Sequence, residues 1–551
     1  MGRSLHRTTP TLALAAAFLA ASAPALASEG PLVAAPAGTF EGTQDDTVSV
    51  FRGIAYAEAP SGELRWRPPV RKADAAEPVD ATRFGDICHQ PELPDVPANI
   101  YYEDLPPRSE DCLLLNIWRP AGAEKVPVLV WIHGGSLLTG ASRFSLYDGK
   151  RMAERGVMVV SINYRLGALG FLAHPALSAE SPEGISGNYG LLDQIEALRW
   201  VERNIAAFGG DPDNVTVAGE SAGGLSVMHL MASPLAHGLF DKAIMQSAYM
   251  VSEPALAEDR NGHPSAESEG LRVAAAAGTD TLADMRSMDA RELTAKATAA
   301  GFRTYPTVDG KVVPAQLVEV FDQGAQAQVP IIAGFNSGEI RSLRVLLPPA
   351  PSGSREYEEK IRAAYGDVAD VFLRIYPSDA IDQSMLETTR DALYGWTSQR
   401  LAEKQPAETQ AYLYVFDRPY PAADKAGLHA FHGSELPYMF GTIDQTARNW
   451  PRIPRTREER GFSDAMVDYW TSFARTGIPE AADGPEWPAY EQGQSWMVFG
   501  EDRKVVEDVL SYRYDLIEHV VCRRRAAGNQ QWNWNVGVGA PVLPPLEGDC
   551  G

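Results

Sequence analysis

The stretch Val215-Thr216-Val217-Ala218-Gly219-Glu220-Ser221-Ala222-Gly223 leads an apolar run directly into a serine flanked by glycines. Its last five residues fit the pattern Gly-x-Ser-x-Gly, and Leu225, Met228 and Leu230 begin a stretch that is compatible with a helix. Glycine lets a chain turn tightly from strand to helix while the serine hydroxyl is held clear of the sheet. The stretch therefore predicts a nucleophile at Ser221; the alternative is a tight turn whose serine only links two elements.

Five more short apolar runs indicate buried strands, and a helical pattern lies between some of them. In residues 188–208, apolar residues recur at intervals of three and four and mark one face of a helix. Buried strands that alternate with helices predict a mostly parallel sheet flanked by helices on both faces, and so an α/β fold. The strand candidates are residues 126–132, 157–162, 215–218, 243–246, 329–334 and 412–416.

The same alternation explains the length of 551 residues without independent domains. We expect a single α/β domain over residues 28–551, with a C-terminal tail from about residue 505. Residues 253–304 and 348–404 have weaker patterns and are interpreted as insertions. Insertions at the carboxyl ends of sheet strands are a place where a substrate gorge can be built.

Charge excludes one class of partner. Lys and Arg number 49 against 72 Asp and Glu, which gives a formal net charge of −23. Nucleic acid is therefore not expected as a partner, because its binding requires a basic face that displaces counterions.

The beginning of the chain is typical of a secretory signal peptide. Arg3 and Arg7 precede an apolar stretch at residues 12–23, and Ala25-Leu26-Ala27 provides small residues for cleavage after about Ala27. A membrane anchor is the weaker alternative, because the apolar stretch is shorter than the roughly 20 residues that a spanning helix needs. We therefore expect residues 1–27 to be removed, an exported mature protein in the periplasm or outside the cell, and no membrane span.

Export favours disulfides for the four cysteines. Cys88 and Cys112 enclose 23 residues rich in proline and acidic groups, and a bridge there would stabilise the fold by about 3 kcal/mol in the loop-entropy account. Cys522 and Cys550 would then close the C-terminal tail, although four cysteines allow three pairings. No Cys/His cluster has zinc spacing, so no metal is expected.

A nucleophilic serine needs a base to remove its proton and an acid to orient that base. In hydrolases with this type of elbow the order along the chain is serine, acid, histidine, which leaves His429, His432 and His519. His432 lies in a loop after the strand candidate that ends near residue 416, His429 lies in the same loop, and His519 lies in a packing segment. Glu339 follows another strand candidate, and a solvated loop glutamate is an equally compatible interpretation of it.

A glycine-rich segment, Trp131-Ile132-His133-Gly134-Gly135-Ser136, follows the strand candidate at residues 126–132. Backbone N–H groups in such a loop, together with the N–H of the residue after the nucleophile, can bind the oxyanion of an ester in its transition state.

Several further stretches, in one order along the chain, point to a known family. They are FRGIAYA (51–57), LRWRPP (64–69), EDCLLLNI (110–117), NYGLLDQ (188–194) and YWTSFA (469–474). With the glycine-rich loop and the serine elbow, they resemble the type-B carboxylesterases of the carboxylesterase and cholinesterase family, which have the α/β-hydrolase fold. The resemblance covers residues 51 to about 490. It implies that the chain is a serine hydrolase of carboxylic esters that uses no cofactor and takes a small-molecule ester.

The resemblance also assigns roles to residues. It implies Ser221 as nucleophile, Glu339 as acid and His432 as base, and it supports a disulfide between Cys88 and Cys112. The implied oxyanion donors are the N–H groups of Gly135, Ser136 and Ala222. Ser247 matches a serine that supports the acid and base, and Arg65 and Glu110 match a structural salt bridge.

Two features depart from the family pattern. Ser136 replaces the usual third glycine, and the tryptophan often found shortly after the Ser247 segment is missing. Both positions bear on the acyl side of the pocket, so the natural ester is not indicated. We further hypothesise that Arg341 or Arg344 attracts a carboxylated acyl group, with solvated surface as the alternative.

Two other functions are compatible with these residues. One is a non-catalytic adhesion or binding module, since some relatives with this fold lack the serine. The other is hydrolysis of amides or thioesters by the same groups.

Overall fold

The computed structural model describes residues 1–2, 30–96, 99–406, 408–533, 536–546 and 550. Within these residues the main sheet has 11 strands. In sheet order they are β16 (Arg503–Glu507), β15 (Ser495–Phe499), β14 (Ala411–Phe416), β13 (Ile331–Asn336), β12 (Lys242–Gln246), β11 (Gly210–Glu220), β9 (Val126–Ile132), β10 (Met158–Ile162), β8 (Leu114–Pro120), β4 (Val48–Ala55) and β3 (Thr43–Gln44).

The middle of this sheet is parallel and its edges are antiparallel. From β10 to β15 every neighbouring pair is parallel, whereas β16 and the strands from β8 to β3 pair antiparallel. This confirms the predicted mostly parallel sheet. The six predicted strands form a continuous block from β10 to β14, and each predicted end lies within five residues of the observed one.

The sheet lies between two hydrophobic cores. The strand β9 contributes side chains to both of them. Val128, Val130 and Ile132 belong to one core, and Leu129 and Trp131 belong to the other. Side chains alternate between the faces of a strand, so an uninterrupted apolar run is what a strand buried on both faces requires.

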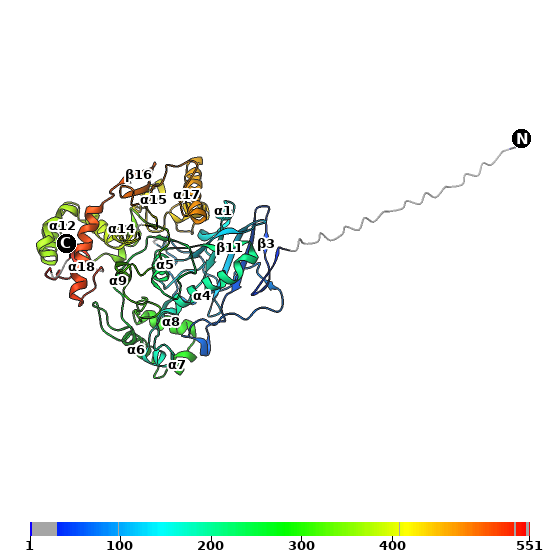
Figure 1. The fold of residues 1–551 in the computed structure, drawn as a ribbon, viewed down its shortest axis with the longest axis horizontal. Helices are drawn as coiled ribbons and strands as arrows, with labels where there is room; N and C mark the ends of the chain where they lie inside the picture. The colour runs from blue at the N-terminus through cyan, green and yellow to red at the C-terminus, as the bar shows by residue number, and fades with distance from the viewer. Residues whose placement is uncertain (3–29, 97–98, 407, 534–535, 547–549, 551) are drawn as a thin grey trace.

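Helices cover both faces (Figure 1). α4 (Tyr189–Asn204) and α5 (Ala222–Ala232) pack on one face, and α17 (Arg457–Thr476) packs on the other. The predicted helix at residues 188–208 is confirmed as α4, followed by a 3-10 turn at Ile205–Phe208. The remaining helices outside the insertions are α1 (Lys150–Ala153), α2 (Gly167–Phe171), α3 (Pro175–Glu180), α9 (Leu317–Asp322), α10 (Glu339–Ser342), α15 (Pro421–Lys425) and α16 (Leu436–Phe440).

The two expected insertions are helical, and each packs with residues from other parts of the chain in a hydrophobic cluster separate from the two main cores. The first contains α6 (Ala266–Ala277), α7 (Leu282–Ser287) and α8 (Ala290–Ala299). The second contains α11 (Ser354–Tyr365), α12 (Ala369–Ile375), α13 (Ile381–Arg390), a π-helical turn (Asp391–Gly395) and α14 (Trp396–Glu403). The expected C-terminal tail forms β16 and α18 (Ser511–Ala527), and α18 packs against the second insertion near the end of the chain (Figure 1).

Covalent and ionic links join distant segments. The structure pairs Cys88 with Cys112 and Cys522 with Cys550. Arg65 and Glu110 form the expected salt bridge, with a nitrogen-to-oxygen distance of 2.6 Å.

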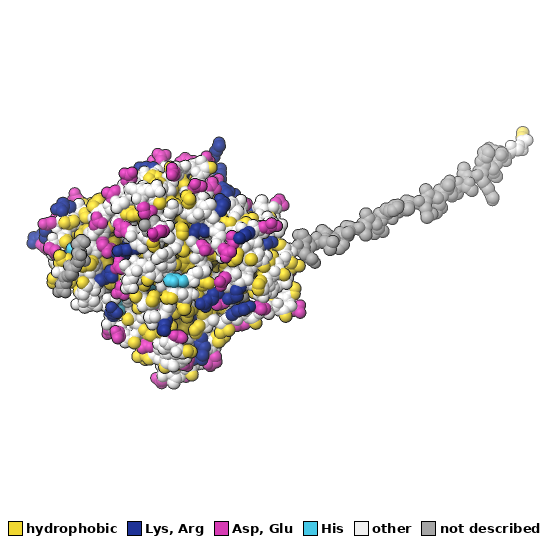
Figure 2. All heavy atoms as spheres, viewed as in Figure 1, with side chains coloured by type: hydrophobic (Ala, Val, Ile, Leu, Met, Phe, Trp, Pro, Cys, Tyr) yellow, Lys and Arg dark blue, Asp and Glu magenta, His cyan; other side chains and the backbone are white. Residues whose placement is uncertain are grey.

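The surface carries interspersed acidic and basic side chains over the face that Figure 2 shows. The helices of the described residues include none that is long and apolar enough to cross a membrane. The expected signal peptide and its cleavage point near Ala27 lie outside the described residues.

Candidate active site

Ser221 lies at a sharp turn between β11, which ends at Glu220, and α5, which begins at Ala222. Its backbone angles, φ 56° and ψ −122°, are sparsely populated by residues other than glycine, so the surrounding structure must hold this conformation. The two motif glycines explain how. A Cβ atom on Gly219 would lie 2.4 Å from the carbonyl carbon of Gly223, and one on Gly223 would lie 2.1 Å from the carbonyl oxygen of Ile132.

The glycine-rich loop after β9 runs alongside this turn. A Cβ atom on Gly134 would lie 3.1 Å from Cβ of Ser221, so the loop approaches the serine as closely as a backbone can. Gly135, Ser136 and Leu137 have positive φ angles of 107°, 59° and 56°. Ser136 therefore adopts, without the freedom of glycine, the conformation that a third glycine would favour.

Tyr164 contacts the glycine-rich loop through the carbonyl and the ring of His133. The Tyr164 hydroxyl donates a hydrogen bond of 2.9 Å to the His133 carbonyl, and the two rings stack with centroids 4.6 Å apart. Burial lowers the pKa of His133 to about 4, so its ring is neutral near neutral pH. This histidine therefore holds the loop and does not add a positive charge.

The two remaining predicted residues meet beside this turn. Glu339 begins α10 after β13, His432 lies in the loop before α16, and His432 Nδ1 is hydrogen-bonded to Glu339 Oε2. Glu339 is fully buried, and His432 is 7% exposed. A buried carboxylate on Nδ1 fixes the orientation of the imidazole and leaves Nε2 available for proton transfer.

Other side chains hold this pair in place. Ser247 Oγ donates a hydrogen bond of 2.6 Å to Glu339 Oε1, where the N–H of Asn336 also donates at 2.8 Å. The Tyr101 hydroxyl donates to the His432 carbonyl at 2.7 Å. Tyr101 lies between Cys88 and Cys112, so the segment that their disulfide closes contacts the histidine loop.

Two further buried glutamates were not predicted. Glu220 Oε1 lies 3.1 Å from His432 Nε2. Glu435 accepts a hydrogen bond of 3.0 Å from Gln246 and a second one from Asn336. Glu220 directly precedes Ser221, and Glu435 follows His432 by three residues. Their burial beside His432 comes from the fold, so no local pattern marked them.

These carboxylates determine the proton distribution. Burial raises the pKa of Glu220 and of Glu435, because the charged forms lose hydration. Burial alone lowers the pKa of His432, but Glu220 and Glu339 outweigh it and raise the value to about 9. His432 Nε2 lies 3.1 Å from Glu220 Oε1, although that oxygen accepts no hydrogen bond from the described residues.

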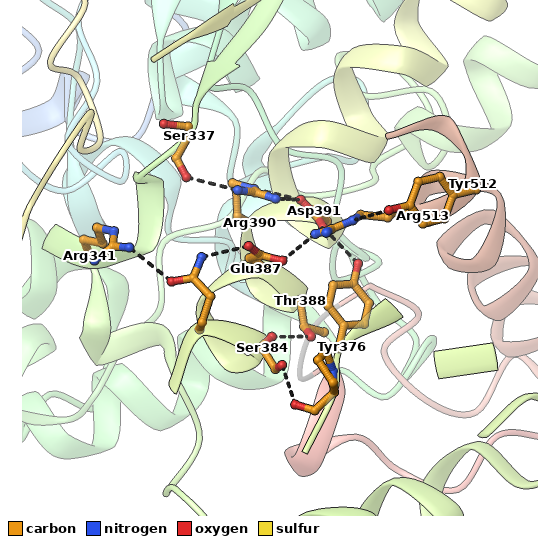
Figure 3. Close-up of polar contacts among 12 residues, drawn as sticks. Ser337, Arg341, Tyr376, Ser384, Glu387, Thr388, Arg390, Asp391, Tyr512 and Arg513 are labelled. Carbon is orange, nitrogen blue, oxygen red and sulfur yellow. Dashed lines mark hydrogen bonds and ion pairs between the residues drawn. The ribbon is translucent and has the colours of Figure 1, made fainter. Parts of the chain in front are cut away.

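The other basic candidates lie elsewhere. His429 contacts Asp417 at 2.9 Å, and His519 contacts the Cys550 carbonyl at 2.6 Å. Arg341 donates to Gln383 of α13 at 3.1 Å, as Figure 3 shows, and Arg344 pairs with Asp382. Because α13 already engages both arginines, they lose support as groups that attract an acyl carboxylate.

A cavity of about 340 Å³ lies within the first insertion. Its lining includes Phe171, His263, Phe302 and Tyr305. Burial raises the pKa of Tyr249, and Tyr305, which lines the cavity, and Glu220 raise it further. The first insertion supplies most of the cavity lining, in which apolar side chains are mixed with charged ones such as Arg272.

A second buried histidine–glutamate pair lies away from the serine turn. His229 Nε2 is 2.7 Å from Glu253 Oε1, and each side chain is 1% exposed. His229 Nδ1 and Glu253 Oε2 have no hydrogen-bond partner among the described residues. This pair has the donor and acceptor of the first, but no serine of the described residues is hydrogen-bonded to either side chain.

Comparisons with known proteins point to one family. Residues 29–515 match the carboxylesterase family. The chain is 36% identical over 483 residues to fumonisin B1 esterase of Sphingopyxis macrogoltabida, covering 84% of this chain and 85% of that protein. It is 34% identical over 470 residues to para-nitrobenzyl esterase of Bacillus subtilis (strain 168), covering 83% and 91%.

Solved structures give the same result. A PNB esterase superposes with a TM-score of 0.75 at 31% identity, covering 88% of this chain and 98% of that one. A carboxylesterase of Geobacillus stearothermophilus superposes with a TM-score of 0.68 at 32% identity, also over 88% and 98%. These likenesses confirm the α/β-hydrolase fold.

Proposed function

Because this chain belongs to the carboxylesterase family and is a carboxylic-ester hydrolase, we propose that Ser221, His432 and Glu339 carry out its reaction through an acyl-enzyme. One observation carries the proposal: a buried His432–Glu339 pair lies beside a serine turn that glycines hold open. Nucleophile, base and orienting acid are the three parts that hydroxyl activation requires.

In the first half of the reaction, Ser221 Oγ attacks the ester carbonyl carbon while His432 Nε2 takes the serine proton. The negative charge that forms on the carbonyl oxygen is bound by the N–H groups of Gly135, Ser136 and Ala222. Ala222 is the first residue of α5, whose N-terminal dipole also favours that charge. Collapse of the intermediate breaks the carbon–oxygen bond, and the departing alcohol takes the proton from His432.

In the second half, water attacks the acyl-enzyme and gives its proton to His432, and Ser221 regains that proton as the carboxylic acid leaves. Glu339 stabilises the imidazolium in both halves, and Ser247 and Asn336 hold Glu339 in place. Glu220 and Glu435 flank the pair, and their negative charges favour the protonated form of His432. His432 must be neutral at the start of each half, so activity increases as it loses its proton.

The substrate of this chemistry is a small-molecule ester. The relatives are named for different esters, including fumonisin B1 and para-nitrobenzyl esters, so the family does not select one. The cavity lined largely by the first insertion is our candidate for the substrate group that extends from the reacting carbonyl. A panel of esters with matched amides and thioesters, ranked by kcat/KM, tests the acyl class and the amidase and thioesterase alternatives together.

The decisive test of the site is Ser221→Ala. We expect kcat for p-nitrophenyl acetate to fall by about 10⁶-fold, with an unchanged circular dichroism spectrum and melting temperature. A fluorophosphonate probe should label the wild type at Ser221 and leave the variant unlabelled. Retained turnover in the variant, or labelling of another residue, would refute the assignment; an unlabelled and inactive wild type would favour the binding-module alternative.

We also propose that the protein is exported, because both cysteine pairs form bridges and disulfides persist in oxidising compartments. Sequencing the mature N-terminus from fractionated cells tests this proposal. A start near Ser28 in the periplasm or medium supports it, and an intact Met1 in the cytoplasm contradicts it.

A further inference from the structure

A cluster of buried charges surrounds the π-helical turn Asp391–Gly395, about which the reaction scheme above says nothing. Asp391 is fully buried. It accepts hydrogen bonds from Arg390 Nε at 2.7 Å, from the Tyr376 hydroxyl at 2.9 Å and from Arg513 Nη1 at 3.0 Å, as Figure 3 shows. A buried carboxylate with three donors from separate segments fixes those segments relative to one another.

The cluster reaches the loop that carries Glu339. Arg390 Nη1 donates to the Ser337 carbonyl at 3.1 Å (Figure 3). Ser337 stands two residues before Glu339, and its own N–H donates to the Phe416 carbonyl at 2.9 Å. Arg390 therefore holds one side of the loop on which the orienting acid depends.

The same turn also reaches His432. Tyr394, the fourth residue of the turn, is 2% exposed, and its ring centroid lies 5.5 Å from that of His432 with the ring planes 37° apart. The turn thus reaches both members of the acid–base pair. Asp391 is linked to the Glu339 loop through Arg390, and the Tyr394 ring packs against the His432 ring. Single π-helical turns occur frequently at functional sites.

The C-terminal helix α18 and the residues after it contact this turn. Arg513, near the start of α18, also donates to Glu387 of α13 at 2.6 Å. A Cβ atom on Gly395 would lie 2.4 Å from the ring of Tyr514, so α18 and the turn are in direct contact. Asn533 donates to the Ala392 carbonyl at 2.8 Å.

We propose that Arg390, Asp391 and Arg513 are positioning residues, through which the seating of the C-terminal helix α18 sets the alignment of Glu339 and His432. The inference rests on the proposed function, because it assumes that these two residues act as acid and base. It gives the C-terminal helix a role in the rate of ester hydrolysis, although that helix contributes no group to the reaction.

Arg513 is the best position for a test. It is the member of the cluster that comes from α18, and its loss leaves Asp391 paired with Arg390 and Tyr376, so the buried carboxylate keeps partners. Arg513→Met retains the apolar stem of the side chain and removes the charge. Arg513→Lys restores the charge without the planar fork that bridges Asp391 and Glu387.

For p-nitrophenyl acetate we expect Arg513→Met to lower kcat by about 10 to 100-fold, the effect of misplacing a catalytic group by about an ångström. KM should change little, because the cluster lines no part of the cavity. Arg513→Lys should recover part of kcat. The acid limb of the kcat/KM profile should move to lower pH, because a looser Glu339 stabilises the imidazolium less while Glu220 and Glu435 still face it.

The same helix supplies a matched control. Arg523 is also buried in α18, but it pairs with Asp367 at 3.0 Å and donates to the Pro544 carbonyl at 2.8 Å, remote from the π-helical turn. Arg523→Met should lower the melting temperature as much as Arg513→Met does, while it leaves kcat and the acid limb at their wild-type values.

Two outcomes overturn the inference: wild-type kcat and pH profile in Arg513→Met, or equal changes in both arginine variants. Failure of the proposed function is distinguishable, since it would appear in the wild type as a lack of fluorophosphonate labelling at Ser221. If Arg513→Met does not fold, Arg513→Lys is measured at low temperature instead. A partial loss of kcat with an unchanged melting temperature supports the positioning role, and an unchanged kcat contradicts it.

Discussion

The serine turn and the acid–base loops lie next to each other but are held by different forces. The turn is fixed by backbone contacts within one short stretch and its neighbour, where a methyl group on Gly223 would meet the carbonyl oxygen of Ile132 at 2.1 Å. Glu339 and His432 are fixed by side-chain hydrogen bonds from segments far apart in the sequence, among them Ser247 and Tyr101. The first region should therefore respond to added volume, and the second to the loss of single polar groups.

After Ser221→Ala, the largest effect is expected in the acid–base region, in Glu339→Gln. The amide keeps the shape of the side chain but cannot stabilise the imidazolium or hold its tautomer, so kcat should fall by about 10⁴-fold. Stopped-flow kinetics with p-nitrophenyl acetate measure this change. Glu253→Gln makes the same substitution in the other buried histidine–glutamate pair, and it should keep kcat within a few fold. An equal loss of kcat in both variants would contradict a specific role of Glu339 as the acid that orients His432.

In the serine turn, the substitution Gly223→Ala should lower the stability of the protein. The added Cβ meets backbone atoms that cannot move aside, so we expect a loss of about 3 kcal/mol or more in the free energy of unfolding, measured by denaturant titration. Gly461→Ala is the control. Gly461 lies in α17 with open space around it, and alanine there should be neutral or stabilise by about 0.5–1 kcal/mol. Equal stability in the two variants would contradict the steric account of the turn.

The contrast between the regions also explains what the sequence could predict. The serine turn and the block of strands from β10 to β14 follow from local patterns, because glycine spacing and apolar runs directly encode backbone geometry. The edge strand β16, and β4 next to the opposite edge, were not predicted, since partly exposed strands lack a continuous apolar run.

The acid–base region was accessible to the sequence only in part. His429 and His432 share one loop, and it is the fold that turns the first toward Asp417 and the second toward Glu339. Glu220 and Glu435 resemble ordinary polar residues until the fold buries them beside His432. Their importance arises from tertiary burial, which no local pattern records.

A smaller effect is expected when one support of the acid is removed, in Ser247→Ala. Glu339 Oε1 keeps the N–H of Asn336 but loses the serine hydroxyl, and a hydrogen bond to a charged group contributes about 1.5–3 kcal/mol. We expect kcat to fall by about tenfold or more and the unfolding free energy to fall as well. Ser463→Ala removes a buried hydroxyl that donates to the Tyr438 carbonyl at 2.8 Å. It should lower stability alone, and a matching fall in its kcat would contradict the supporting role of Ser247.

The smallest effect, and the one that joins the two regions, is expected in Glu220→Gln. Glu220 belongs to the serine turn by sequence, yet its carboxylate lies 3.1 Å from His432 Nε2 and raises the pKa of that histidine toward about 9. In the proposed mechanism the reaction requires neutral His432, so kcat/KM should increase with pH through this pKa. Removing the carboxylate should lower the pKa and move the acid limb to lower pH by about one unit, since a shift of one unit corresponds to 1.36 kcal/mol of interaction. The pH profile of kcat/KM for a neutral ester measures it, with buffer ionic strength held constant. An acid limb that stays in place, or moves to higher pH, would mean that Glu220 is already protonated when His432 titrates, and that the serine turn and the acid–base loops do not interact electrostatically.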